Sequence, residues 1–149
     1  MAIHHFLKLG PIKGESYDRD HREEIDVLAW SWGSSHDGQR MSPQSLSLTK
    51  YIDASSPLIL ALHHRQSTVE AVLTARKAGE HRIVAVRLSL AGVRVEAISM
   101  GGSGDADRLT ENVSLSFESL KLEVQPQDPS GRALDIIEYG LEVAPSGPR

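Results

Sequence analysis

Histidine is the residue type in this chain with the clearest capacity for chemistry, because imidazole binds metals and transfers protons near neutral pH. The sequence has seven histidines, and four of them form the adjacent pairs His4-His5 and His63-His64. Adjacent side chains on a strand or helix point in different directions, so neither pair forms a metal site by itself. No His-Glu-x-x-His pattern is present. We interpret the histidines as scattered surface or partly buried residues and expect no metal.

Other patterns that could support catalysis or ligand binding are incomplete. The glycine-rich segment Gly101–Gly104 lacks a following Gly-Lys-Ser/Thr and precedes an expected strand, so we predict a loop without bound phosphate. Asp105 and Asp107 lack the glycine and distal glutamate of a calcium loop. No Gly-x-Ser-x-Gly elbow is present, and the absence of cysteine excludes thiol nucleophiles and disulfides. We therefore expect no catalytic residue and no cofactor.

Length and composition narrow the class of protein. The 149 residues and 16.3 kDa fit one domain over residues 1–149. A hydrophobic content of 40% with 24% charged residues is typical of folded proteins. The net charge of −4 disfavours nucleic acid and acidic lipid as partners. We find no signal peptide after Met1 and no apolar run of about 18 residues, so we expect synthesis in the cytoplasm and no membrane insertion.

Alternating apolar and polar residues predict a mostly β fold. The predicted strands, which alternate with turn signals, are Ile3–Leu9, Ile25–Gly33, Leu46–Thr49, Thr68–Ala78, Ile83–Leu90 with a continuation beyond Gly92, Asn112–Val124 and Ile137–Val143. In Asn112–Val124 the apolar parity changes, which predicts a bulge near Glu118-Ser119. The charged segment Lys13–Glu24 is expected to be a solvated loop, and Ser34–Pro43 is rich in turn residues.

One short helix completes this prediction. Ser55-Ser56-Pro57 is typical of a helix start, and Leu58 and Leu62 share a stripe at helical spacing with either Ile59 or Ala61. A helix of two to three turns must pack on the sheet to be stable. The predicted fold is an antiparallel two-sheet β-barrel of about eight strands with one short α-helix.

The second predicted strand has two unlike faces. Its even-numbered residues Asp26, Leu28, Trp30 and Trp32 form a bulky face that we assign to the core, opposite the smaller odd-numbered residues. Small residues recur with one parity in other strands too, as the pairs Ala29 and Ser31, Ala71 and Ala75, Ala85 and Ser89, and Ala97 and Ser99. Such faces fit contact with another subunit or the lining of a wide cavity, and chance composition explains them equally well.

Several segments together resemble the Hcp family, the haemolysin-coregulated proteins of the type VI secretion inner tube. They are Gly14–Ser16, Glu23–Gly33 with its Trp-Ser-Trp-Gly string, Leu48–Leu58, Thr74–Gly79, Gly101–Asp105, Arg108–Val113 and Gln125–Gln127. The resemblance covers about residues 6–143. This chain has a shorter loop between Trp32 and Leu46 than many relatives, and its segment Ser130–Ile136 is compressed.

The resemblance implies a structural, non-enzymatic subunit. Six copies form a ring, and rings stack into a tube inside a contractile sheath with a spike and baseplate. The tube is expelled from the bacterial cytoplasm without a signal peptide and carries or shields small effector proteins. It further implies that Val27, Ala29 and Ser31 face the lumen.

The same resemblance places the two loops that hold Glu15, Asp105, Arg108 and Glu111 at ring rims or subunit contacts. A different class of function uses the same scaffold, since a fold does not fix a function. The alternative is a monomeric or small-oligomer β-barrel that binds carbohydrate or protein. An enzyme is the third interpretation, and no set of residues supports it.

Overall fold

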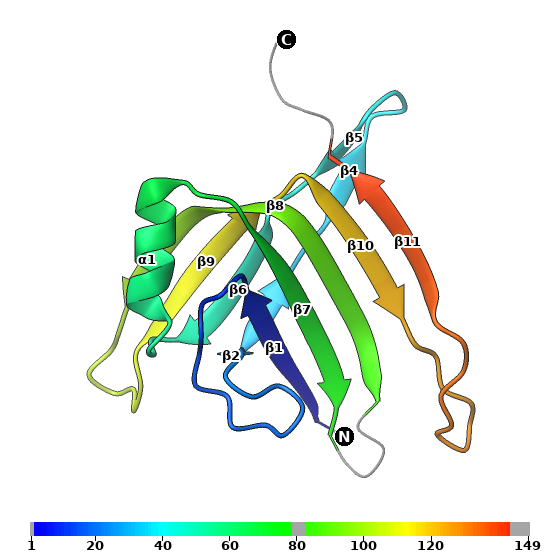
Figure 1. The fold of residues 1–149 in the computed structure, drawn as a ribbon, viewed down its shortest axis with the longest axis horizontal. Coiled ribbons are helices and arrows are strands. Elements are labelled where there is room, and N and C mark those ends of the chain that lie inside the picture. Colours follow the sequence, from blue (N-terminus) through cyan, green and yellow to red (C-terminus); the bar gives the residue numbers. More distant parts are fainter. Residues whose placement is uncertain (1, 79–82, 144–149) are drawn as a thin grey trace.

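A strongly bent antiparallel sheet forms two layers in the computed structural model, which describes residues 2–78 and 83–143 (Figure 1). The first layer has the order β2-β1-β7-β8-β10-β11, and the second layer has the order β8-β9-β6-β3. The strands of the two layers are β1 (Ile3–Leu9), β2 (Ile25–Val27), β3 (Ala29–Ser31), β6 (Leu46–Tyr51), β7 (Val69–Lys77), β8 (Val84–Gly101), β9 (Thr110–Ser116), β10 (Ser119–Val124) and β11 (Ile137–Glu142).

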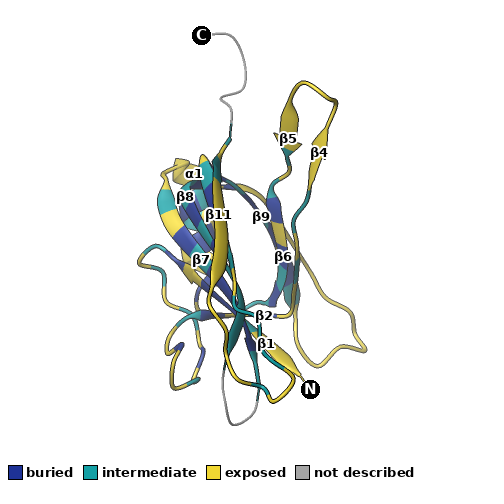
Figure 2. Ribbon diagram, turned by 90° about the vertical axis from the view of Figure 1, so that its right-hand side faces the viewer, coloured by how far each residue is buried: buried dark blue, intermediate teal, exposed yellow. Residues whose placement is uncertain are grey.

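The predicted class, mostly β with antiparallel sheets and one helix, is confirmed over the described residues. The sheet is not closed into a barrel, because β11 pairs only with β10 and β3 pairs only with β6. The buried core residues come from the strands of both layers and from the helix, and Figure 2 shows buried residues on the strands of both layers. The turn-rich segment after Trp32 forms a protruding hairpin of β4 (Ser34–His36) and β5 (Met41–Pro43).

Strand β8 belongs to both layers because it bends at Gly92. Gly92 has a φ of +63°, and a Cβ there would lie 2.5 Å from the Glu118 carboxylate. Buried residues are even-numbered before the bend, as in Leu90, and odd-numbered after it, as in Val93. Opposite the bend, Phe117, between β9 and β10, and Leu120, in β10, are both buried. The predicted change of parity near Glu118-Ser119 is therefore right, but the predicted bulge is wrong, because β9 ends at Ser116 and a separate strand, β10, begins at Ser119.

The predicted second strand is split in two at Leu28. Val27 is buried in the core beside β1, whereas Leu28 is 43% exposed. The predicted placement of Val27 in the lumen and of Leu28 in the core was therefore wrong. Asp26 is exposed as well, although its parity placed it in the core. The chain crosses from the first layer to the second at Leu28, whose N–H donates to the carbonyl oxygen of Thr49 at 2.8 Å. Because of this crossing, the odd-numbered residues of β2 face the core, whereas beyond Leu28 the even-numbered residues do so.

Beyond the crossing, the tryptophans pack against the core as predicted. The Trp30 indole N–H donates to His5 Nδ1 at 3.0 Å, and the Trp32 indole N–H donates to the carbonyl oxygen of Gln44 at 2.7 Å. These two bonds satisfy the polar end of each ring.

The charged segment Lys13–Glu24 covers the outer face of β1 and β7. The predicted solvated loop was therefore wrong, because part of this segment packs against the sheet. Arg76 forms two hydrogen bonds with the Asp18 carboxylate, at 2.6 and 2.5 Å. The Phe6 ring stacks on the His21 ring with 4.4 Å between the ring centroids, and the Arg76 guanidinium carbon lies 5.2 Å from the Phe6 ring centroid. The segment packs there because the outer face of β1 and β7 carries an apolar ring, Phe6, that it shields from water and a cation, Arg76, that binds its carboxylates.

Helix α1 (Ser56–Arg65) begins at the predicted Ser-Ser-Pro signal and packs on β8. Ile59 and Leu62 are buried, whereas Leu58 is exposed, so the predicted stripe was right at Leu62 and at its alternative member Ile59 and wrong at Leu58. His63 Nδ1 lies 2.7 Å from the carbonyl oxygen of Val95 and fixes the helix to the strand edge. Among the described residues, no helix is long and apolar enough to cross a membrane.

Candidate functional surface

The exposed face of the second layer carries two rows of small uncharged side chains, which we call the small-residue face. Strand register places one residue of β3, β6, β9 and β8 in each row. The first row is Ala29, Thr49, Asn112 and Ser99, and the second row is Ser31, Ser47, Ser114 and Ala97. The alternate residues of the same strands, among them Leu48 and Val113, point into the core.

This face is uniform in its chemistry. The eight residues are four serines, one threonine, one asparagine and two alanines, and none of them is charged. Thr49 Oγ1 donates to Asn112 Oδ1 at 2.7 Å across two strands. Solvent-facing sheet surfaces of single proteins usually carry charged side chains. The face therefore suits close passage or enclosure of another molecule without strong binding.

The sequence located this face only in part. Ala29, Ser31, Ala97 and Ser99 lie on it, whereas Val27 belongs to the core and cannot share it. Sequence reasoning missed its central residues in β6 and β9. The alternation of Ser47 with Leu46 and Leu48 was the available signal for β6.

Two other predicted pairs do not contribute to the face. Ala71 and Ala75 are buried in the first layer, so their small size reflects core packing rather than an outer surface. Ala85 and Ser89 are half-buried in the first layer.

Two of the predicted contact residues, Glu15 and Arg108, line one pocket of about 370 Å³. The Arg108 guanidinium stacks over the Tyr51 ring with 3.8 Å between the guanidinium carbon and the ring centroid. Glu15 Oε2 accepts a hydrogen bond from the Ala54 N–H at 2.6 Å. Asp105 lies outside this pocket on an exposed loop, where its N–H donates to Ser103 Oγ at 3.3 Å.

Two titratable groups in this pocket have shifted pKa values. Asp26 is exposed as a whole residue, but partial desolvation of its carboxyl in this pocket, and then the negative charge of Asp53, raise the pKa of that carboxyl above its usual range. Burial, and then the neighbouring His4, lower the pKa of His5. A neutral His5 is the form that accepts the hydrogen bond from Trp30, so this lowered pKa agrees with the geometry.

Glu111 was predicted to be a subunit contact, and the structure contradicts this. Its side chain is 0% exposed, and its Oε1 lies 2.5 Å from Lys50 Nζ. Lys50 is also fully buried and bonds to Asp53 Oδ1 at 3.0 Å and Ser56 Oγ at 3.2 Å. The carboxylate therefore joins β9 to β6 and to the start of α1 inside the protomer.

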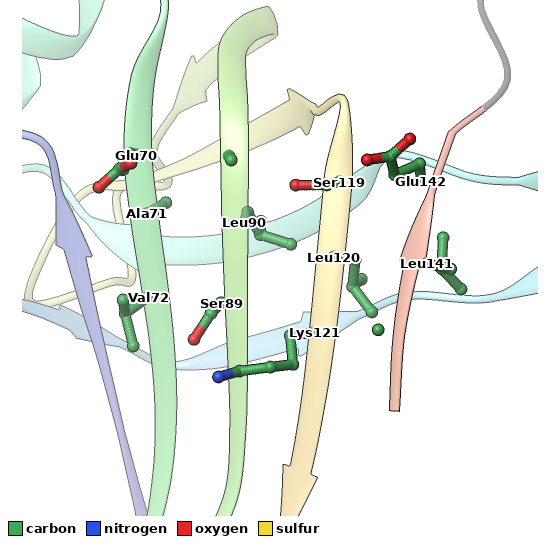
Figure 3. A pocket seen from close by; sticks show the side chains of 12 residues that line it. Glu70, Ala71, Val72, Ser89, Leu90, Ser119, Leu120, Lys121, Leu141 and Glu142 are labelled. Carbon is green, nitrogen blue, oxygen red and sulfur yellow. The ribbon is translucent and has the colours of Figure 1, made fainter. Parts of the chain in front are cut away.

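A shallow hollow of about 660 Å³ crosses β7, β8, β10 and β11 in the first layer (Figure 3). Small residues such as Ser89 and Ser119 lie along it, with Glu70, Lys121 and Glu142 as its charged residues. In the parts of the chain that the structure describes, no group of three or more His, Asp or Glu side chains is arranged to hold a metal ion.

Comparison with known proteins places these features in context. Residues 6–124 match the family described as "Type VI secretion system effector, Hcp". The chain is 46% identical to "Protein hcp1" of Pseudomonas aeruginosa, over 96% of each chain. It resembles the crystal structure of Hcp1 from Salmonella typhimurium with a TM-score of 0.82 and 32% identity, covering 95% of each chain.

A second solved structure, a type VI secretion system effector from Yersinia pestis, has a TM-score of 0.80 and 26% identity. That match covers 93% of this chain and 99% of the other. The matched residues include all of the small-residue face and the strands that form it. The chain belongs to the Hcp family of type VI secretion proteins.

Proposed function

We propose that this chain is the repeating subunit of a type VI inner tube. Six copies form a ring around a channel, and rings stack inside the sheath, with a spike and baseplate at the tip. The tube leaves the bacterial cell without a signal peptide and delivers small effector proteins from its lumen. The subunit is structural and performs no catalysis.

The small-residue face is the observation that carries this proposal. It spans four strands and presents no charged side chain in either row. A channel lined by such a face holds and releases folded cargo without the strong contacts that charged or large apolar residues make. We therefore assign Ala29 and Ser31 to the lumen and place the first layer, with its covering segment Lys13–Glu24, on the outside of the ring.

The pocket that holds Glu15 and Arg108 supports a contact role for these two residues. Both side chains are exposed, and the pocket combines one cation with the carboxylates of Asp26 and Asp53. We assign this pocket, together with the exposed loop that holds Asp105, to the ring rim. Charge reversal at Glu15 or Arg108 is expected to weaken assembly.

Mass and imaging test the assembly itself. Negative-stain images of the purified protein should show rings with a central hole, and light scattering should give six times the protomer mass. A compact monomer at high protein concentration would instead favour the alternative, a β-barrel module that binds carbohydrate or protein.

A substitution in the lumen tests cargo carriage. Ser31→Trp adds a large side chain to the small-residue face, so an effector produced in the same cells should be retained less while the ring persists. Ser35→Trp, on the exposed hairpin strand β4, is the matched control and should retain the effector normally. Unfolding of Ser31→Trp, or undiminished retention with an intact ring, would contradict the assignment.

A further inference from the structure

A single side-chain hydrogen bond joins β3 to the first layer in the part of the chain that the structure describes. The Trp30 indole N–H in β3 donates to His5 Nδ1 in β1 at 3.0 Å, and the two half-buried rings meet edge to face at 73°. Strand β3 has only three residues and pairs only with β6 at the edge of the second layer. An edge element with so few contacts is among the first to open locally, so this bond matters for how firmly β3 is held.

The bond requires His5 to be neutral. An indole N–H can only donate, so His5 Nδ1 must carry a free lone pair, and the proton of the neutral ring is then on Nε2. A protonated imidazole has an N–H on both nitrogens and cannot accept a hydrogen bond from an indole. A proton on His5 Nδ1 and the bond from Trp30 therefore exclude each other.

His5 also lies where a proton can reach it, because it lines the pocket of about 370 Å³ described above. The register partner of His5 on β7 is Ala75, and Lys77, two residues further along the same face, is the charged residue of that strand on this side. Strand β3 presents no charged residue to it. The other ionisable residues of the pocket are His4, Glu15, Asp26, Tyr51, Asp53 and Arg108.

These surroundings set the pH range in which His5 changes charge. Imidazole is the side chain whose charge ordinarily changes between about pH 5 and 8. Burial, and then His4, lower the pKa of His5, so the ring is neutral and the bond is intact at neutral pH. The pocket contains three carboxylates and one guanidinium, so it accommodates the positive ring that forms in acid.

We propose that His5 is an acid-sensitive switch that controls how firmly β3 is held. Protonation of Nδ1 breaks the bond from Trp30 and leaves the indole N–H without its acceptor, which is destabilising for a partly buried donor. Strand β3 then loosens from β1. Because β3 carries Ala29 and Ser31 of the small-residue face, acid would loosen part of the channel wall, a consequence that rests on the proposed function.

Tryptophan emission reports the state of this bond, because the chain has only two tryptophans. Trp32→Phe leaves Trp30 as the only one. A protonated imidazole in contact with an indole quenches its emission, so the Trp30 emission should fall as the pH is lowered from about 8 to about 5, with a midpoint below 6.5. Trp30→Phe is the matched control, since the Trp32 indole donates to the backbone carbonyl of Gln44, and it should show no such transition.

Substitutions of the two adjacent histidines assign the transition. In the Trp32→Phe background, His5→Gln provides an acceptor that does not titrate, so the transition should disappear. His4→Gln should keep the transition and move it to higher pH, because His4 lowers the pKa of His5. Circular dichroism establishes that each variant folds, and His5→Asn replaces His5→Gln if that variant does not. Constant Trp30 emission over this pH range, or a transition that survives the loss of His5, would overturn the switch.

Hydrogen exchange measured by mass spectrometry tests whether β3 loosens. The ratio of the β3 exchange rate in the natural chain to that in His5→Gln should rise between about pH 8 and about pH 5. Strand β9 is the internal control, since it pairs with β6 on one side and β8 on the other, and its ratio should stay constant. A constant ratio for β3 would contradict the loosening. A monomeric chain in which Trp30 still titrates would overturn the proposed function and leave the switch, whereas a ring with constant Trp30 emission would overturn the switch alone.

Discussion

The buried pair of Lys50 and Glu111 is expected to contribute more to folding than any exposed ion pair in the chain. Lys50→Met preserves most of the side-chain volume and removes the charge. Lys50 Nζ donates to Glu111 Oε1 at 2.5 Å, to Asp53 Oδ1 at 3.0 Å and to the carbonyl oxygen of Tyr51 at 2.9 Å. Lys50 Nζ also donates to Ser56 Oγ at 3.2 Å, so the substitution leaves four acceptors without this donor.

The acceptors differ in the hydrogen bonds that they keep once Lys50 is replaced. Asp53 retains hydrogen bonds from the N–H and hydroxyl of Ser55, at 2.9 and 2.5 Å. Glu111 retains only the Ser56 hydroxyl at 2.6 Å, and its Oε2 is buried without a partner among the described residues. Breaking a buried pair in this way costs about 3–5 kcal/mol. With a denaturant slope of about 2 kcal/mol per molar urea, the unfolding midpoint should fall by about 2 M.

Urea titration at one fixed protein concentration measures this loss, because assembly makes stability depend on concentration. The double variant Lys50→Met, Glu111→Leu removes both charges and should lose much less than the sum of the two single variants, with a coupling of about 2–3 kcal/mol. A loss of under about 1 kcal/mol for Lys50→Met, or additive effects in the double variant, would refute this account of the pair.

Three further predictions follow from the titratable groups. The pKa of His5 is below its usual 6.5 in the folded chain, so the unfolded chain binds more protons as the pH falls from about 6.5 towards the lowered pKa. The free energy of unfolding should therefore decrease over this pH range, and His5→Gln should make the decrease smaller in urea titrations at successive pH values. Asp26→Asn should raise the melting temperature at pH 7, because partial desolvation in the pocket and the neighbouring carboxylates raise the pKa of the Asp26 carboxyl, and the gain should vanish near pH 3.8; an unchanged melting temperature at pH 7 would count against this environment. Asp18→Asn should release the segment Lys13–Glu24 from Arg76 and speed its cleavage in limited proteolysis, with unchanged cleavage as the contrary result.

Local sequence patterns predicted most of the strands and the helix start because alternation and capping act over a few residues. They failed where the chain changes layer. The parity reversal at Leu28 depends on pairing of β2 with β1 and of β3 with β6, and these partners are distant in the sequence. No local pattern contains that information.

Buried charge was missed for a different reason. Lys50 shares the parity of Leu46 and Leu48, and Glu111 shares that of Val113, so the alternation already placed both on the core side. We assigned Glu111 to the loop Gly101–Glu111 because the predicted strand began at Asn112, and unpaired charges are almost never buried. The pairing of two charges across neighbouring strands, which permits burial, becomes visible only once β6 and β9 are aligned.

The small-residue face was only partly predictable because small residues also fill tight places in a core. Ala71 and Ala29 look alike in a strand pattern, yet Ala71 is buried and Ala29 is exposed. The register across β3, β6, β9 and β8 separates the two cases.

Distances between spin labels at Ser31 test most directly whether the small-residue face surrounds a channel. A chain without cysteine permits single labels through Ser31→Cys and, on the opposite side of the protomer, Tyr17→Cys. Six copies in a ring predict distances in ratios of about 1 to 1.7 to 2 for each label, with the shorter set from Ser31. Distances from Ser31 that equal or exceed those from Tyr17, or no distance between copies, would contradict the account.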